Sequence, residues 1–247
     1  MPIRLPAPPV PPTVSLAIYE ELRRLIVRGR LLPGTRLTEA DVARELEASR
    51  TPAREALRRL RQEGLLVPTG AEDGAKIRVA VAPMTREEAR ELYLAAGALE
   101  GVAARGVTGL AAAERRALAK RMRRAEEAFE REASRRAPDW DRLFDLHDAF
   151  HRALRDALAG PRLRAMLDTL RPHLDRYEYV YAPLLAPGYD ATFAEHDAIV
   201  RAMAAGSADA AERAVRANWF RGAERLTAVV EQAGEAGFLR ALRRVEG

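Results

Sequence analysis

Histidine is scarce in this chain of 247 residues, and two of its four histidines are spaced so that they could bind one metal ion together. His147 and His151 are four residues apart in LHDAFHRAL, so both can project from one face of a helix and chelate a single ion. His196 lies in AEHDAIV, on another predicted helix. Neutral imidazoles suit divalent Zn, Ni, Cu or Fe, and the sequence does not choose among these metals.

A second concentration of functional side chains is the arginine-rich stretch SRTPAREALRRLRQEG at residues 49–64. On a helix, four of its arginines would share an arc of about 80° beside an apolar face: Arg50, Arg54, Arg58 and Arg61. Like charges on one arc repel, and a polyanion would relieve the repulsion. Guanidinium groups bind guanine edges and phosphates, so we predict that this helix enters the major groove of DNA. A solvated surface face is the alternative.

The charge balance places this feature in the first third of the chain. Residues 1–80 contain 14 Lys/Arg and 10 Asp/Glu, a net charge of +4, whereas residues 81–247 contain 27 and 26, a net charge of +1. A local excess is typical of a footprint for nucleic acid. Cysteine is absent, which excludes disulfides and thiolate metal sites. We find neither a secretion signal nor a membrane span and therefore expect a cytoplasmic protein.

Two helices are expected before the arginine-rich stretch. The first spans residues 15–29, with Ser15 as its N-cap and apolar residues at helical spacing. After a turn at Pro33-Gly34, the second helix begins at Thr38, whose hydroxyl can cap it while Asp41 answers in a capping box. Both helices would turn their apolar positions toward a shared core.

The third helix carries the arginines and precedes a β-hairpin. We expect Thr51 as its cap, Pro52 as its first helical residue, where a missing N–H costs nothing, and Gly64 as its end. The β-like runs LLVP and AKIRVAV then flank the turn TGAEDG. This order predicts a winged helix-turn-helix domain over residues 15–81, after a flexible proline-rich arm at 1–14.

The rest of the chain has helical periodicity and lacks strand alternation. Helices are predicted at residues 85–106, 110–135, 139–159, 162–182, 190–205 and 208–232. The fold class is therefore mainly α, with an all-α bundle over residues 85–235 as the second domain and a C-terminal tail at 236–247. We expect the bundle to bind an effector and to dimerise.

The segment YEELRRLIVRGRLLPGTRLTEADVARELEASRTPAREALRRLRQEGLL resembles the N-terminal domain of the GntR family of bacterial transcription regulators. The resemblance covers about residues 15–81 and departs at Glu47-Ala48, where the family usually has Gly-Val. It implies that one end of the third helix and the wing contact DNA. These residues are Ser49, Arg50, Thr51, Pro52 and Arg54, with Arg58 from the arginine stripe and Gly70, Gly74 and Lys76 from the wing.

Residues 90–225 resemble the FCD effector domain of the FadR subfamily, an all-helical bundle that often holds a metal. His151 and His196 match two of its ligand positions, His147 occupies the usual Asp position, and Asn218 occupies the last His position. The resemblance implies a three-histidine site with water, effector or Asn218 as the fourth ligand. Asp148 and Glu195 are interpreted as surface residues.

The effector contacts are less well marked by the sequence. Many relatives carry an arginine four residues before a glutamate on the first helix of this domain. Here Glu100 is kept, whereas Ala96 occupies the arginine position. An organic acid could bind an open metal position through its carboxylate. Further candidate contacts are Arg105, Arg152 and Arg171.

Together these observations predict a homodimeric, ligand-responsive transcription regulator, a repressor released from operator DNA by a small organic acid. One rival is a metal-dependent hydrolase, because His147-Asp148-x-x-His151 imitates the HExxH arrangement of zinc peptidases. The other is an architectural DNA-binding protein without an effector, which would show no ligand-dependent change in melting temperature.

Overall fold

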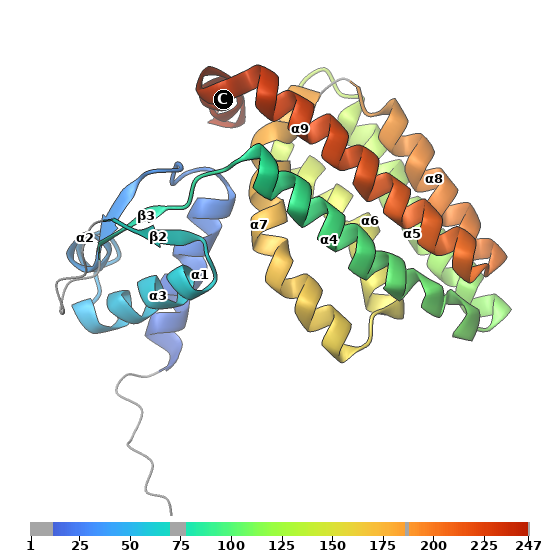
Figure 1. The fold of residues 1–247 in the computed structure, drawn as a ribbon, viewed down its shortest axis with the longest axis horizontal. Helices are drawn as coiled ribbons and strands as arrows, with labels where there is room; N and C mark the ends of the chain where they lie inside the picture. Colours follow the sequence, from blue (N-terminus) through green and yellow to red (C-terminus); the bar gives the residue numbers. More distant parts are fainter. Residues whose placement is uncertain (1–11, 70–77, 186–187, 247) are drawn as a thin grey trace, which may run out of the picture. The chain divides into compact units, whose positions relative to one another are not determined.

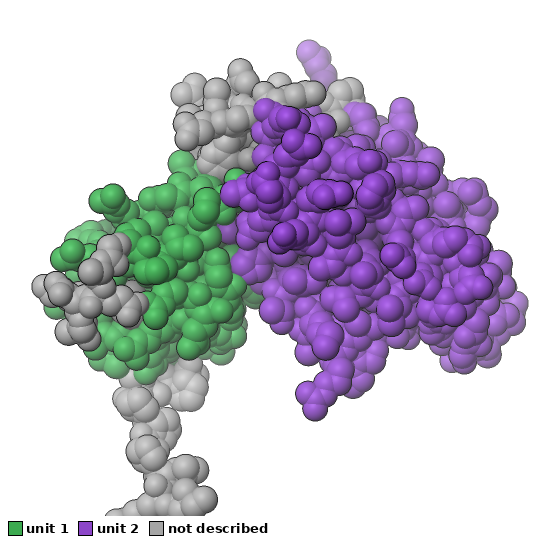
Figure 2. Space-filling model, viewed as in Figure 1, with its two compact units in different colours: residues 1–84 green, residues 85–247 purple. Residues whose placement is uncertain are grey.

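The chain divides between Met84 and Thr85 into two compact units, each with a core of its own (Figure 2). The computed structural model describes residues 12–69, 78–185 and 188–246 (Figure 1). Most of the predicted arm at 1–14 lies outside these residues, as do the wing residues Gly70, Gly74 and Lys76. The predicted fold class, a mainly α protein with a winged helix-turn-helix and a helical bundle, is confirmed.

The first unit contains three helices and a small antiparallel sheet (Figure 1). Its elements are α1 (Pro12–Val27), β1 (Arg36–Thr38), α2 (Glu39–Glu45), α3 (Arg50–Gln62), β2 (Leu66–Pro68) and β3 (Arg78–Val81). The strand order is β1-β3-β2, so the expected hairpin gains a third strand from the segment before α2. This strand, β1, was not predicted. It has only three residues, and so short a run cannot show the alternation of apolar and polar residues that identifies a strand.

Aliphatic side chains hold this unit together. Ala53, Leu57 and Leu60 of α3 are fully buried and pack with Leu22 and Ile26 of α1. Val79 and Val81 of β3 belong to the same core, to which the three helices and the sheet all contribute side chains. The apolar face predicted for α3 is therefore the face that packs, and its arginines lie on the remaining surface.

Two helix starts in this unit differ from the predictions. The first helix begins at Pro12 and not after Ser15, because a proline in the first turn costs no hydrogen bond. The third begins at Arg50 with Ser49 as N-cap, so Pro52 lies within the first turn, where backbone N–H groups lack intrahelical partners anyway. The cap of α2 is as predicted, because the Thr38 hydroxyl accepts the N–H of Asp41 at 3.2 Å.

The second unit is a bundle of helices (Figure 1). Its elements are α4 (Arg86–Arg105), a 3-10 turn η1 (Gly106–Gly109), α5 (Ala112–Ala133), α6 (Trp140–Leu158), α7 (Pro161–Leu185), α8 (Asp190–Ala205) and α9 (Ala208–Glu246). Two helices extend beyond their predicted C-terminal ends. The α7 helix passes Pro183, since a proline fits helical φ, and α9 continues through the expected tail in a segment rich in Ala, Leu and Arg.

The packing of α4 along α9 depends on a glycine (Figure 1). A Cβ atom at Gly97 would lie 2.7 Å from Cβ of Trp219, so only glycine lets the two helices approach this closely. Trp219 is thereby placed over α4, where its indole N–H reaches Glu100, about one turn beyond Gly97. No described helix is both long enough and apolar enough to cross a membrane.

Candidate functional site

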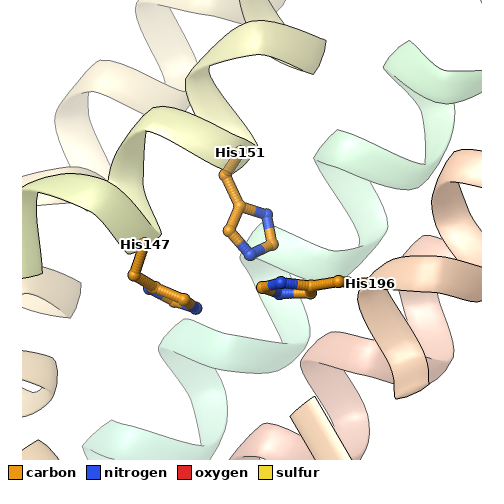
Figure 3. A group of neighbouring side chains, drawn as sticks. All are labelled: His147, His151 and His196. Atoms are coloured by element: carbon orange, nitrogen blue, oxygen red, sulfur yellow. The ribbon is translucent and has the colours of Figure 1, made fainter. Parts of the chain in front are cut away.

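Three histidines converge inside the bundle (Figure 3). His147 and His151 project from α6 and His196 projects from α8, with their rings directed toward a common centre. The ring centroids are 5.1 Å apart for His147 and His151, 5.5 Å for His147 and His196, and 5.3 Å for His151 and His196. One nitrogen from each ring lies within 4.8 Å of the others. The predicted cluster thus forms a nearly equilateral triangle of imidazoles.

A buried carboxylate on α4 orients His151. Nδ1 of His151 lies 2.9 Å from Oε2 of Glu100, which also accepts the indole N–H of Trp219 at 2.9 Å. The other carboxylate oxygen accepts from Nη1 of Arg155 at 3.0 Å. Burial alone would raise the pKa of Glu100, but His151 and Arg155 lower this pKa to about 2. An ionised Glu100 holds the proton of His151 on Nδ1, which leaves Nε2 as the nitrogen for the centre.

His196 has the same arrangement on the opposite side of the centre. Its Nδ1 lies 2.6 Å from Oε2 of Glu126 on α5, and its ring stacks on Phe150 at a centroid distance of 3.9 Å. Nε2 of His196 is buried and has no hydrogen-bond partner. Burial, reinforced by the negative charges of Glu130 and Asp197, raises the pKa of Glu126 to about 8. A cation bound at the centre would stabilise the ionised form of this carboxylate.

His147 is tied to a chain of buried charges. Its Nδ1 lies 3.5 Å from Oε2 of Glu178 on α7, and that carboxylate is 3.8 Å from Nη2 of Arg171. Arg171 also pairs with Asp148 at 3.1 Å, and Asp148 accepts from Arg155 at 2.7 Å. Because Arg155 also contacts Glu100, this chain of alternating negative and positive side chains continues from α7 to α4 and connects the two histidines of α6.

These residues fit a divalent metal ion. Each imidazole has a carboxylate at Nδ1, the usual second partner of a metal-binding histidine. Burial lowers the pKa of His151 and lowers that of His196 well below its usual range, so both rings are neutral near pH 7, as ligands must be. The unpaired Nε2 of His196 is the group that a metal would satisfy.

A cavity of about 90 Å³ borders the cluster, and we call it the histidine cavity. Its wall includes His147, His151 and Asn218, together with several aromatic side chains. Nδ2 of Asn218 donates to Glu195 at 3.0 Å, which leaves its carbonyl oxygen as the donor atom for a fourth ligand position. Contrary to the interpretation as a surface residue, Glu195 is buried, and its carboxylate is held by both Asn218 and Arg225.

The four residues considered as effector contacts have other partners. Glu100 is buried behind His151, and Arg171 is buried among carboxylates. Arg105 donates from the surface to Asp209 and Glu212 of α9, and Arg152 is exposed and lies 3.6 Å from Asp148. Among the described residues, the polar groups that line the cavity are different ones, including Thr192 and Arg225.

Asp148 does not take the position of a catalytic base. It is largely buried, and its Oδ1 is engaged by Arg155 and Arg171. Burial would raise the pKa of Asp148, but these arginines lower it below its ordinary value. A carboxylate held this way has little tendency to take a proton.

In the first unit, α3 presents its N-terminal end to solvent. Ser49, Arg50 and Thr51 are exposed, and the Ser49 side chain makes no capping hydrogen bond. Arg58 is also exposed, two residues before Leu60, which is buried on the opposite, packed face. Pro52 is buried, so it serves as a residue of the first helical turn and of the core, and its side chain is not free to contact DNA.

Two other arginines of α3 form contacts with side chains of the protein. Nε and Nη2 of Arg54 donate to the two oxygens of the buried Glu39, at 2.5 and 3.1 Å, although 40% of the Arg54 side chain stays exposed. Arg59 lies 3.7 Å above the Tyr19 ring and pairs with Glu63 at 3.1 Å. The exposed positive charge is therefore concentrated at Arg50 and Arg58.

Sequence reasoning missed the carboxylates behind the histidines. Glu178 had a detectable signal, since it is a lone charge in the aromatic run YEYVY. Glu126 had none, because it lies in a helix crowded with charges, AERRALAKRMRRAEEAFEREA. Arg225 and Trp219 were missed because their role depends on which helices pack together.

Comparisons with known proteins identify the family to which each unit is related. Residues 14–70 match the family described as bacterial regulatory proteins, gntR family, and residues 91–219 match the FCD domain. The HTH-type transcriptional repressor RspR of Escherichia coli is 27% identical over 203 residues, 82% of this chain and 84% of the repressor.

Two solved structures have a similar fold. A GntR transcriptional regulator from Rhodococcus sp. RHA1 has a TM-score of 0.64 at 21% identity, covering 87% of this chain and 97% of that one. McbR/YncC of Escherichia coli has a TM-score of 0.65 at 18% identity, covering 90% and 99%.

Proposed function

The chain belongs to the GntR family of DNA-binding transcription regulators and carries a C-terminal FCD domain, and from this premise we propose that it is a metal-containing repressor controlled by an organic acid. The observation that carries the proposal is the buried triangle of histidines with a carboxylate behind each ring. It would act in the cytoplasm on double-stranded operator DNA.

The DNA-facing part of the proposal rests on the exposed end of α3. Ser49, Arg50 and Thr51 offer a hydroxyl pair, a guanidinium and free N–H groups of the first turn, which suit phosphates and base edges. Arg58 extends the positive surface along the helix. Arg54 would act from a fixed position, because Glu39 restrains its guanidinium while leaving part of it exposed. The wing residues Gly70, Gly74 and Lys76 remain part of the proposal through the resemblance alone.

The metal would be held by His147, His151 and His196, with Asn218 or a ligand atom in the fourth position. A bound divalent ion would give the cavity a positive charge and an open coordination position suited to a carboxylate. Glu100, Glu126 and Glu178 orient the three rings from behind. Zinc is the simplest choice for testing, since neutral imidazoles at a four-coordinate centre suit it.

A route from this site toward the DNA-binding unit runs along α7. Glu178 contacts His147, and the preceding residue, Tyr177, bonds the start of α4. The Tyr177 hydroxyl accepts the N–H of Thr85 at 2.8 Å, lies 3.0 Å from its carbonyl oxygen and donates to Glu88 at 2.5 Å. Thr85 directly follows the last residue of the first unit. A shift of α7 on ligand binding would thus change the anchoring of the linker, and a ligand that favours one arrangement would change operator affinity.

Dimerisation is supported by an apolar patch on the bundle surface. Leu94 and Val102 lie two turns apart on α4 and are exposed, as is Phe220 on α9. Leu94 and Phe220 line one groove between these helices, which run side by side in Figure 1. Large exposed apolar groups in a cluster are typical of an interface. We propose that a second copy covers this patch and that the dimer binds a pseudo-palindromic operator.

The hydrolase alternative finds no support in the described residues, because the only acid of the HDxxH motif is neutralised by arginines. Turnover of a peptide or ester by the zinc-loaded protein, abolished by Asp148→Asn, would revive it.

The deciding experiment measures operator affinity of the full chain with and without zinc and organic acids. The DNA would be the intergenic region next to its own gene, at low salt. We expect specific binding that weakens when an acid binds the zinc-loaded protein, and no response to acid in His196→Ala. An operator affinity that ignores every zinc and acid condition would remove the effector part of the proposal.

A further inference from the structure

The wall of the histidine cavity points to a particular kind of acid. We propose that its ligand is a carboxylic acid with an aromatic or other cyclic apolar body, and that polyhydroxylated sugar acids are excluded. The inference rests on the proposed function, because it places the carboxylate at the histidine centre and asks what surrounds the remainder of the molecule.

Five aromatic side chains other than the histidines line the cavity. Tyr93 and Trp219 meet edge to face with centroids 5.3 Å apart, and Phe129 and Tyr189 do the same at 5.4 Å. Phe144 lines the cavity as well, and its own ring meets that of Tyr179 edge to face at 5.8 Å. Rings fixed by such contacts form a preformed surface on which a further ring can stack or pack edge-on.

The polar groups in the wall are largely committed to the protein. The indole N–H of Trp219 is donated to Glu100, and the amide N–H of Asn218 is donated to Glu195. Both terminal nitrogens of Arg225 donate to Glu195, at 2.8 and 2.9 Å, and one of them also reaches the Thr192 hydroxyl at 3.4 Å. A ligand hydroxyl that enters this space therefore finds no free donor in these groups. The acceptors that remain are the carbonyl oxygen of Asn218, assigned to the fourth ligand position, and the carboxylate of Glu178, which lies 3.5 Å from His147 at the histidine centre.

The energetic consequence separates the two classes of acid. A buried hydroxyl without a partner loses its hydrogen bonds to water, whereas an apolar ring gains free energy in proportion to the area that it buries. Both classes place the same carboxylate at the histidines, so the body of the molecule decides the difference. The wall favours the ring and disfavours several hydroxyls together.

The test compares two series of acids on the zinc-loaded full chain by calorimetry. One series contains phenylacetate, 3-phenylpropionate and indole-3-acetate; the other contains gluconate and glucuronate. We expect the best aromatic acid to bind at least about tenfold more tightly than either sugar acid. Phenylacetamide, which keeps the ring but lacks the carboxylate, should lose that affinity.

A cavity-filling variant provides the structural control. Gly222 lines the cavity, and a Cβ atom there would lie 3.3 Å from Cε1 of Tyr93, so Gly222→Leu directs a side chain into the space proposed for the ring. We expect it to abolish binding of the aromatic acid while zinc affinity is retained. Gly109→Leu is the matched substitution, since nothing lies within 4 Å of a Cβ atom at Gly109, and it should bind the acid like the wild type.

The outcomes distinguish failure of the proposed ligand class from failure of the proposed function. Gluconate binding as tightly as the aromatic acids, with release of operator DNA, would overturn the proposed ligand class and keep the proposed function. Aromatic binding that survives Gly222→Leu unchanged would overturn the placement of the ring. If no acid of either series binds the zinc-loaded protein, the proposed function fails and the ligand class fails with it.

Discussion

The two units of this protein use charge in opposite ways. In the first, arginines extend from α3 over a core made of aliphatic side chains, and Arg50 and Arg58 are exposed. In the second, charged groups are turned inward, and Glu100, Arg155, Arg171 and Glu178 are all buried around three histidines. One unit presents its functional groups on a surface that folds without them, whereas the other builds them into its interior.

This difference determines how each site can be changed. A surface arginine can be replaced without disturbing the core, so the effect should appear mainly in binding. A buried ion or histidine has neighbours that were desolvated together with it. Its removal leaves these neighbours without a compensating charge or hydrogen bond. Function and stability should therefore separate in the first unit and stay coupled in the second.

The largest effect is expected from removing a metal ligand. His196→Ala deletes the imidazole whose Nε2 lacks a partner, and it should lower zinc affinity by more than the roughly 10–100-fold typical of changes behind the ligands. Glu126→Gln, which keeps the shape of the partner at Nδ1, should give that smaller loss. Competition with a chromophoric zinc chelator measures both.

His173 provides the control for this prediction. It lies on α7 outside the cluster, with Nδ1 4.0 Å from Glu88, so His173→Ala should leave zinc affinity unchanged. Equal zinc binding by His196→Ala and the wild type would show that the triangle is a packing arrangement of the core.

The next effect tests whether function and stability separate in the first unit. Arg50→Ala should weaken operator binding by about 1–3 kcal/mol with no loss of stability, because the side chain is exposed. Arg54→Ala should lose affinity and also stability, since it leaves the buried Glu39 unpaired. Fluorescence anisotropy at several salt concentrations and urea unfolding give the two quantities.

A double mutant sharpens this point. If Glu39 is the reason for the instability of Arg54→Ala, adding Glu39→Gln should restore part of the lost stability while DNA binding stays weak. Full operator affinity in Arg50→Ala, with an unchanged salt slope, would contradict the placement of α3 on DNA.

The surface site was the easier one to predict. The apolar face of α3, the cap at Thr38 and the arginine stripe follow from local spacing, and the structure confirms the first two. What local spacing could not reveal was the Arg54–Glu39 pair, because its partners belong to different helices. The short strand β1 was missed for a similar reason, since its identity comes from pairing with β3.

The buried site shows the limit more clearly. The pair His147 and His151 is visible in one helix, and His196 was added by resemblance, yet each supporting carboxylate comes from a further helix. Glu100 was identified as a candidate effector contact, and the sequence did not reveal its hydrogen bond to His151. Contacts across α4, α5, α6, α7 and α8 depend on packing, which one-dimensional periodicity does not contain.

A pH experiment probes the buried charges directly. Burial raises the pKa of Asp175 to about 7 from 3.8, although Arg171 opposes this shift. The folded protein therefore keeps a proton that the unfolded chain loses near pH 4, so this contribution to stability is present below pH 4 and is lost as pH rises through about 7. The slope is at most about 1.4 kcal/mol per pH unit. Relative to Asp175→Asn, the wild type should lose unfolding free energy from pH 5 to pH 8, as urea titrations in chelator would show.

A smaller effect is expected where the buried site meets the linker. Tyr177→Phe keeps the ring but removes the hydroxyl that bonds Thr85 and Glu88. Zinc affinity should not change, whereas the coupling between acid and DNA, typically 1–3 kcal/mol, should fall by about 1 kcal/mol. Operator titrations with and without a bound acid measure the coupling. An unchanged coupling in Tyr177→Phe would exclude the route along α7.

The smallest effect concerns a turn in the first unit where the sequence departs from the family it resembles. Glu47, in place of the usual glycine, has φ of 49°, a left-handed conformation that costs a residue with a Cβ about 1–2 kcal/mol. Glu47→Gly removes this strain but gives the unfolded chain more freedom, so the net stabilisation should be about 0.5 kcal/mol. The matched change Glu45→Gly, at the end of α2, should destabilise by a similar amount because no strain is relieved there. Glu45 also loses its exposed ion pair with Arg44, at 3.1 Å, and such pairs contribute little. Opposite signs for the two Glu-to-Gly changes would show that backbone conformation sets the stability of this turn; equal signs would contradict it.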